Sequence, residues 1–168
     1  LVAAGNSASA DAGLGISGTL CYLFIYSILV IGTLGIVTIV AGKGDNETSL
    51  NAFKGLGKSN PVLAMGMTVL LLAQAGVPLT SGFVAKFGII RAAVSTESYV
   101  LAVVAMLAAV IAAFLYLRIM VSMWLSEGTT SRDVSVAFST RLAICLCVGA
   151  TVVLGFFPSL LLQFTNQL

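Results

Sequence analysis

Apolar residues along this chain are gathered into four runs, and short polar stretches separate them. The runs cover residues 18–41, 61–95, 99–125 and 141–164. A helix needs about 20 apolar residues to cross the hydrocarbon core of a bilayer, and it satisfies its own backbone hydrogen bonds there. The pattern therefore predicts an all-α protein, a polytopic bundle of transmembrane helices. In the last run we expect a kink at Pro158.

The second run is too long for one straight crossing. A helix of the 34 residues from Pro61 to Val94 would measure roughly 51 Å, whereas the hydrocarbon core is about 30 Å thick. Gly76, Pro78 and Gly82 interrupt the run, because proline removes a backbone donor and glycine tolerates unusual dihedral angles. We therefore predict a discontinuous helix, with half-helices at 61–75 and 82–95 and a short non-helical joint. Irregular backbone at membrane depth occurs inside protein or beside water, and discontinuous helices mark ion pathways in transporters.

Three polar stretches precede or connect the runs. Residues 5–17 are predicted to form a loop rich in Gly, Ala and Ser, 42–60 a linker and 126–140 a second loop. The linker, the second loop and their flanks hold six of the eight basic residues: Lys43, Lys54, Lys58, Arg118, Arg132 and Arg141. The positive-inside rule places this linker and loop in the cytoplasm and both ends of this piece outside.

The linker also carries a short apolar pattern. Leu50, Phe53 and Leu56 recur at three-residue spacing. This spacing indicates a short helix on the membrane surface, and Gly55 and Gly57 are expected to end it.

Composition excludes the soluble classes. The chain is 59% hydrophobic and 8% charged, whereas soluble domains carry about 25% charged residues. A net charge of +2 does not favour nucleic acid or acidic partners. The chain has no histidine, and its three cysteines fall in apolar runs, so a zinc, iron–sulfur or haem site has no support. We expect no cofactor in this chain.

Lys86 is the main candidate for chemistry. It lies one turn into the second half-helix, 26 residues after Asn60 and 11 before Glu97, which predicts a position near mid-depth or somewhat toward the outer side. A lysine there costs about 2.5–3.5 kcal/mol, so such residues usually face a bundle interior and mark an ion path. Desolvation opposes its charge and nearby helix-end carbonyls favour it, and a lysine balanced in this way can exchange a proton. The alternative is a lysine that only snorkels or pairs charge.

Polar neighbours of the break have two interpretations each. Thr80 and Ser81 are placed to cap the second half-helix or to bind water. Gln74 lines the same cavity or forms an interhelical hydrogen bond. Tyr22 and Tyr26, one turn apart, serve packing or place a hydroxyl on a water path.

Two stretches of this sequence resemble a known family. Residues 76–83 read Gly-Val-Pro-Leu-Thr-Ser-Gly-Phe and are followed by Lys86 and Phe87; upstream, residues 53–61 read Phe-Lys-Gly-Leu-Gly-Lys-Ser-Asn-Pro. These stretches are similar to the broken helix and preceding linker of the antiporter-like membrane subunits of respiratory complex I, most closely bacterial NADH-quinone oxidoreductase subunit N. The resemblance covers about residues 18–125. It implies that residues 1–168 are the C-terminal part of a single antiporter-like transmembrane domain.

The resemblance also implies a function. It implies proton translocation in the bacterial inner (plasma) membrane, driven by quinone reduction in partner subunits, with Lys86 as the proton carrier. Quinone, FMN and iron–sulfur clusters are expected in those partners, and the other expected contacts are membrane subunits, lipid and protons. Two alternatives remain open at this point: a subunit of a multisubunit Na⁺/H⁺ antiporter, and a structural membrane scaffold. Replacing Lys86 by Met separates the scaffold from the two transporters.

Overall fold

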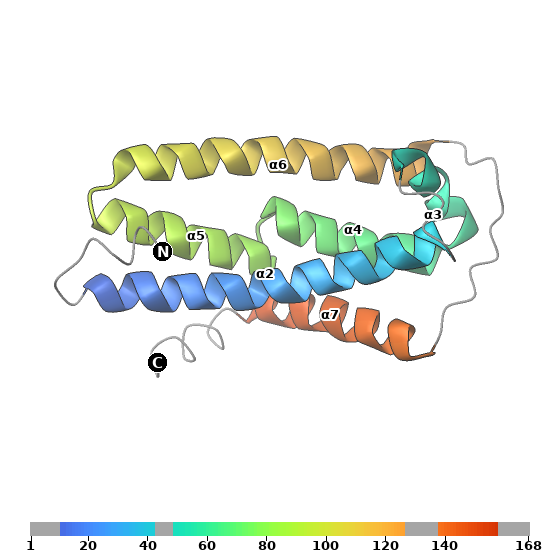
Figure 1. The fold of residues 1–168 in the computed structure, drawn as a ribbon, viewed down its shortest axis with the longest axis horizontal. Coiled ribbons are helices and arrows are strands. Elements are labelled where there is room, and N and C mark those ends of the chain that lie inside the picture. Colours follow the sequence, from blue (N-terminus) through green and yellow to red (C-terminus); the bar gives the residue numbers. More distant parts are fainter. Residues whose placement is uncertain (1–10, 43–48, 127–137, 158–168) are drawn as a thin grey trace.

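The computed structural model describes residues 11–42, 49–126 and 138–157. In chain order its elements are α2 (Asp11–Ala41), η1 (Leu50–Phe53), α3 (Leu56–Ser59), α4 (Pro61–Ala75), α5 (Ser81–Ser95), α6 (Tyr99–Leu125) and α7 (Phe138–Phe156) (Figure 1). Within these ranges the secondary structure is helical and contains no strand. The predicted all-α class is therefore confirmed.

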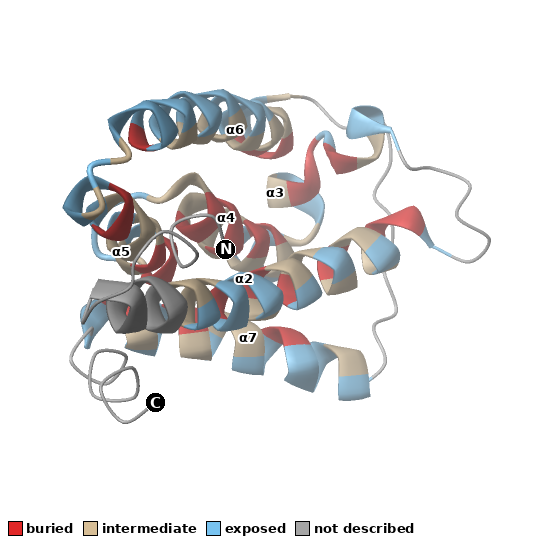
Figure 2. Cartoon of the chain, turned by 60° about the vertical axis from the view of Figure 1, so that its left-hand side comes forward, coloured by how far each residue is buried: buried red, intermediate tan, exposed pale blue. Residues whose placement is uncertain are grey.

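The helices form a bundle of layers. In Figures 1 and 2, α6 runs along one side, α2 and α7 lie on the opposite side, and α4 and α5 lie between them, end to end along the long axis. Contacts follow this order, because α2 packs on α5, α7 and α4, while α6 packs on α4 and α5. Among the described residues, three helical segments are long and apolar enough to cross a membrane, namely Thr19–Ala41 of α2, α6 and α7, and α4 is a shorter apolar helix.

The core lies along α4 and the facing side of α2. Ile36 of α2 and Ala64, Leu70 and Ala73 of α4 are fully enclosed, and the buried residues of α4 are visible in Figure 2. Gly32 of α2 permits the close approach, since a Cβ there would lie 2.8 Å from the Cβ of Cys147 and 2.9 Å from Cδ1 of Leu70. The small residues of the first apolar run thus bring α7 and α4 against α2, as small residues do between membrane helices.

The helices α4 and α5 meet at a joint built from standard helix ends. Gly76 has φ 84°, and the N–H of Val77 donates to the carbonyl of Leu72 at 3.1 Å while that of Gly76 donates to Ala73 at 3.0 Å. This is the Schellman arrangement, which favours glycine at the left-handed position. Thr80 then begins α5 as its N-cap, with Ser81 as first helical residue, one residue before the predicted start at 82.

Two further predicted boundaries are wrong. The predicted loop 5–17 contains the first two turns of α2, which begins at Asp11; adding residues to an existing helix is cheaper than nucleating one, so the span extends through Gly13 and Gly15. The last helix begins at Phe138 rather than 141. The predicted kink at Pro158 and the extension to 164 lie outside the described residues.

The linker also differs from its prediction. Gly55, with φ 71°, divides it into η1 and α3, while Gly57 lies inside α3 against the ring of Trp124. Phe53 and Leu56 are 7% and 5% exposed, so they are part of the protein core rather than a membrane-facing surface. Leu50, the first residue of the three-residue spacing, is 41% exposed, so the spacing identified two core residues and one exposed one. Both η1 and α3 pack on α6.

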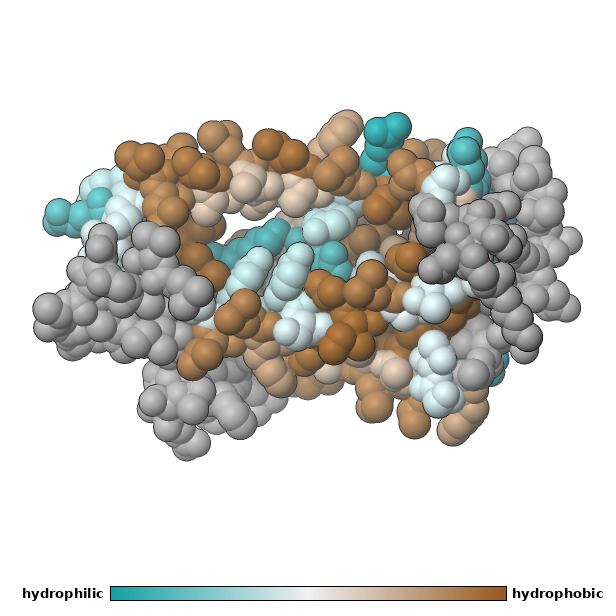
Figure 3. All heavy atoms as spheres, viewed as in Figure 1, coloured by the Kyte–Doolittle hydropathy of each residue, from teal (hydrophilic) through white to brown (hydrophobic). Residues whose placement is uncertain are grey.

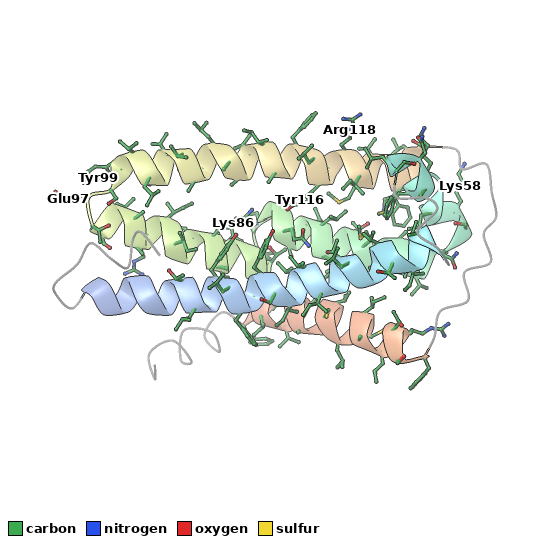
Figure 4. All side chains as sticks on the ribbon, in the orientation of Figure 1. Lys58, Lys86, Glu97, Tyr99, Tyr116 and Arg118 are labelled. Carbon is green, nitrogen blue, oxygen red and sulfur yellow. The ribbon has the colours of Figure 1, made fainter. Side chains whose placement is uncertain are left out.

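The predicted topology agrees with this arrangement. The linker helices, the C-terminal end of α6 and the start of α7 lie at one end of the bundle (Figure 1). Figure 4 places Lys58 at that end, where the positive-inside rule requires basic residues. The side of the membrane that this end faces stays a prediction.

Candidate functional site

Lys86 lies near the middle of the bundle. In Figure 4 it lies between the end that carries Glu97 and Tyr99 and the end that carries Lys58. Its Nζ donates to the backbone carbonyl of Gln74 at 2.6 Å and to that of Ala75 at 3.1 Å. Within the described residues no carboxylate contacts it. Its interaction with α4 is therefore with helix-end carbonyls.

These two carbonyls are available because α4 ends beside them. The last four carbonyls of a helix have no intrahelical donor. Here the joint itself supplies donors to Leu72 and Ala73, and Lys86 supplies donors to Gln74 and Ala75. A helix C-terminus also carries partial negative charge, which stabilises a cation. Lys86 therefore completes the C-terminal cap of α4 from the first turns of α5.

Close backbone contacts hold the joint in place. A Cβ at Gly82 would collide with the carbonyl oxygen of Ala73, and one at Gly155 of α7 would lie 2.5 Å from the carbonyl oxygen of Leu79. At Gly76 it would lie 3.0 Å from Cδ of Lys86. The predicted break residues Gly76 and Gly82 are thus where α4, α5 and the lysine meet. Gly155 of α7 was not predicted as part of the site, because nothing in the sequence around it indicates this contact.

Pro78 has a different position. It lies in the joint and is exposed. Leu79 beside it is 69% exposed and has φ 70°, a left-handed value that side chains other than glycine rarely adopt. Pro78 helps to end α4 but does not line the cavity described below.

Thr80 and Ser81 have separate roles. Thr80 Oγ1 accepts from the N–H of Phe83 at 3.4 Å and donates to the carbonyl of Val77 at 2.6 Å, so the capping interpretation of Thr80 is correct. Ser81 is 1% exposed, and its Oγ has no hydrogen-bond partner among the described residues. Neither residue lines the cavity beside Lys86.

Gln74 combines both interpretations given to it. Its Nε2 donates to Oγ1 of Thr33 at 2.6 Å and to the carbonyl of Leu29 at 3.2 Å, which links α4 to α2. The residue is 7% exposed and also lines the cavity. Its backbone carbonyl binds Lys86, so one residue connects the lysine, the cavity and α2.

A cavity of about 340 Å³ opens beside Lys86. Figure 3 shows a hollow beneath α6, with hydrophilic side chains on its floor. The lining residues come from four helices: Tyr22, Tyr26, Gln74, Lys86, Ile89, Ile90, Ala105, Ala108, Ala109, Ala112 and Tyr116. Since a water molecule occupies about 30 Å³ in the liquid, this space is large enough for several water molecules.

The wall formed by α6 explains the empty space. Ala105, Ala108, Ala109 and Ala112 follow the three- and four-residue spacing of one helix face, and their small side chains leave room. Tyr116, four residues after Ala112, continues the same face and also lines the cavity. Sequence analysis missed Tyr116; its signal was that it is the one polar side chain on an otherwise alanine face.

The other tyrosines line the opposite wall. The rings of Tyr22 and Tyr26 stack with centroids 5.6 Å apart and an interplanar angle of 10°. Within residues 11–42, 49–126 and 138–157, no three His, Cys, Asp or Glu side chains lie close enough together to hold a metal ion. The site combines an amine, helix-end carbonyls and hydroxyls around a space large enough for water, and such a set is suited to proton exchange.

Comparisons with known proteins agree with one another. Residues 5–112 match the family described as NADH:quinone oxidoreductase/Mrp antiporter, transmembrane. A Mycobacterium tuberculosis protein named NADH-quinone oxidoreductase subunit N is 38% identical over 94% of this chain and 31% of its own length. A Saccharopolyspora erythraea protein of the same name is 43% identical over 90% of this chain and 30% of its own.

One solved structure has the same fold. It is respiratory complex I from Thermus thermophilus with bound aureothin, matched with a TM-score of 0.63 and 17% identity over 89% of this chain and 43% of that one. The chain spans about a third of the length of the curated relatives it matches.

Proposed function

Since this chain belongs to the NADH:quinone oxidoreductase/Mrp antiporter transmembrane family, we propose that it is part of a proton-translocating membrane subunit of an NADH-quinone oxidoreductase. It is a multi-pass protein of the bacterial plasma membrane, as predicted. On this proposal residues 1–168 are the C-terminal part of one antiporter-like domain, and α4 and α5 together make one discontinuous crossing. The partners are the other membrane subunits of the complex.

The observation that carries this proposal is the position of Lys86. Its amine lies at the junction of two helices, bound to carbonyls at 2.6 and 3.1 Å and bordering a cavity. The carbonyls stabilise the ammonium form, while the surrounding apolar helices oppose it. A change of charge near the cavity then decides whether Lys86 holds or releases its proton. Lys86 is therefore the proton carrier of this part of the subunit.

The redox chemistry belongs to partner subunits. Quinone reduction, with FMN and iron–sulfur clusters, supplies the free energy there, and this chain contributes the protonatable group and its surroundings. Gln74 fixes the end of α4 against α2 through Thr33, and Gly76 and Gly82 allow α5 to approach it. Thr80 caps α5. These residues position Lys86 beside the cavity, which offers its proton a short route.

The test uses the full-length subunit in its assembled complex. Membrane vesicles carrying Lys86→Met are compared with vesicles carrying Arg91→Met, which removes an exposed cation from the same helix. We expect Lys86→Met to lose proton pumping and most quinone-linked NADH oxidation, and Arg91→Met to retain both. Normal pumping by Lys86→Met contradicts the proposal and favours a scaffold. Dependence of Na⁺/H⁺ exchange, rather than NADH oxidation, on this subunit favours the antiporter alternative.

A further inference from the structure

Arg118 is a charged side chain on the outer surface of the bundle. It lies on α6, the least buried of the three long apolar segments, and it is itself exposed. Figure 4 places it on the outer edge of α6, and Figure 3 shows a hydrophilic side chain there among hydrophobic ones. In the part of the chain that the structure describes, no hydrogen bond or ion pair reaches its guanidinium. A charge within a membrane helix is normally paired, so its partner lies outside these residues.

The depth of Arg118 puts it within reach of the lipid headgroups. The helix α6 has 27 residues, about 40 Å at the helical rise. A hydrocarbon core of about 30 Å centred on it leaves about 5 Å of helix beyond each edge. Arg118 is seven residues before the end of α6 at Leu125, about 10 Å, so its Cα lies about 5 Å inside the core. An arginine at such a depth extends its guanidinium to the interface.

The outer face of α6 has the side chains of a lipid-facing surface. Around Arg118 it presents Phe114, Leu115 and Val121, which are 65%, 51% and 55% exposed. Interfaces between membrane helices are enriched in small residues, whereas four alanines of α6 line the cavity on its other face. The bulky exposed side chains therefore favour acyl chains, rather than a second helix, as the neighbours of Arg118.

Two lysines lie at the same end of the bundle. Lys54 and Lys58 are exposed, and they belong to the linker, whose helices η1 and α3 pack on α6. Trp124 of α6 fixes this contact: its Nε1 donates to Oγ1 of Thr68 on α4 at 2.9 Å, and its ring lies against Gly57, the residue before Lys58. The linker thus holds two cations beside the C-terminal end of α6.

These three cations have no opposite charge near them in the described residues. The acidic positions there are Asp11, where α2 begins, and Glu97, which follows α5, and both lie toward the other end of the bundle (Figures 1 and 4). Basic residues at a membrane surface attract anionic lipid headgroups. An arginine also binds a phosphate through two parallel N–H···O bonds. The charge and its depth therefore match a phospholipid phosphate.

We propose that Arg118, Lys54 and Lys58 bind the phosphate headgroup of an anionic phospholipid whose acyl chains lie along the outer face of α6. Arg118 binds the phosphate from the edge of the hydrocarbon, and the two lysines add positive charge nearer the water. This site is separate from the proposed function, because it concerns lipid binding and does not involve Lys86. The preference for basic residues on one side of a membrane accounts for the lysines, but not for an unpaired arginine among exposed apolar side chains.

The test is lipid photolabelling of the assembled complex that contains the full-length subunit. The complex is reconstituted in phosphatidylcholine vesicles with a small fraction of a photoreactive lipid, either phosphatidylglycerol or phosphatidylcholine with the same reactive acyl chain. Mass spectrometry of peptides from α6 measures the label on residues 114–125. We expect phosphatidylglycerol to label this segment several-fold more than phosphatidylcholine. Equal labelling means that this face holds lipid without selecting charge, and it overturns the proposal.

Matched variants locate the selectivity. Arg118→Gln is expected to bring the ratio of the two labels close to one. Arg141→Gln is the control, because Arg141 is exposed near the same end but belongs to α7, on the opposite side of the bundle (Figure 1), and we expect the ratio to stay unchanged. An unchanged ratio in Arg118→Gln overturns the site. An equal loss in both variants assigns the selectivity to overall charge and also overturns it.

A second variant covers a failure of Arg118→Gln to assemble. The double variant Lys54→Gln/Lys58→Gln removes two exposed charges, and we expect it to lower the labelling ratio at least twofold. A ratio equal to that of the unmodified complex contradicts the proposal without any change at Arg118.

Two further outcomes identify other occupants of this face. Inorganic phosphate at millimolar concentration is not expected to reduce the label, because the acyl chains hold the headgroup in place; displacement by phosphate assigns the site to the free anion and overturns the lipid. Absence of label on α6 with both lipids shows that protein covers this face, and it overturns the proposal as well. None of these results changes the expected loss of pumping in Lys86→Met, so the two proposals fail separately.

Discussion

Gly82→Ala is expected to disturb the joint between α4 and α5. The Cβ of an alanine at this position would overlap the carbonyl oxygen of Ala73, with the Ala73 carbonyl carbon 2.7 Å away. Both atoms belong to the backbone of α4, so no side chain can turn aside to make room. The first turn of α5 must therefore move away from α4.

The magnitude follows from two opposing effects. Overpacking a close contact destabilises a protein by about 1–3 kcal/mol, and we expect the upper end of this range here because the atoms in the way belong to the backbone. Replacing glycine by alanine inside a helix stabilises it by up to about 1 kcal/mol. The net expectation for Gly82→Ala is a loss of about 1–2 kcal/mol.

Gly88→Ala is the matched control. Gly88 lies in the same helix, and a Cβ there meets nothing within 4 Å. It gains the helix propensity without the collision, so the difference between the two variants isolates the contact with Ala73.

Thermal unfolding of the detergent-solubilised full-length subunit measures this difference. We expect the midpoint of Gly82→Ala to lie below that of the unmodified protein and the midpoint of Gly88→Ala to lie at or above it. Pumping should fall in Gly82→Ala as well, because α5 carries Lys86 away from the carbonyl of Gln74. Equal midpoints for the two variants refute the packing of the joint described above.

Two further predictions concern the contacts around the joint. Gly155→Ala places a Cβ 2.5 Å from the carbonyl oxygen of Leu79 and is expected to destabilise the protein by about 1–3 kcal/mol. Gly149→Ala in the same helix places a Cβ that meets nothing within 4 Å, so this control should be neutral or stabilising. Thermal unfolding midpoints of the two variants test this difference. Gln74→Met removes the 2.6 Å hydrogen bond to Thr33 and is expected to cost about 0.6–1.7 kcal/mol, the range for interhelical hydrogen bonds in membranes. A stability unchanged in Gln74→Met would show that this bond is not what holds α4 to α2.

The helices themselves could be predicted from the apolar pattern. Residues 99–125 were predicted with both ends correct, because a long run bounded by polar residues has one way to form a helix. The break at Gly76 was also accessible, since only glycine and proline chemistry ends a helix inside an apolar run. The extension of α2 to Asp11 could not be predicted in this way, because Gly13 and Gly15 have low helix propensity. The helix continues through them because it is already formed downstream, and residue types at these positions do not reveal that.

The site could be predicted from the sequence only in part. Lys86 was predicted from the cost of a lysine at membrane depth and from its position beside a helix break, and the family resemblance pointed to the same residue. Its partners are backbone carbonyls of Gln74 and Ala75, and every residue has a carbonyl, so no residue type in the sequence announced them. Tyr116 lines the cavity and Gly155 packs against the joint, and both lie on helices that are distant from Lys86 along the chain. Their roles depend on how the helices are rotated against each other, which side-chain packing decides.

The most direct test of the central claim is the number of protons pumped per NADH oxidised in vesicles carrying Lys86→Arg in the assembled complex. Arginine keeps a positive charge and N–H donors for the end of α4, but it does not release a proton in proteins. If Lys86 acts by exchanging a proton, the complex assembles and this ratio falls. If the ratio equals that of the unmodified complex, a fixed charge suffices at this position, and Lys86 is not a proton carrier.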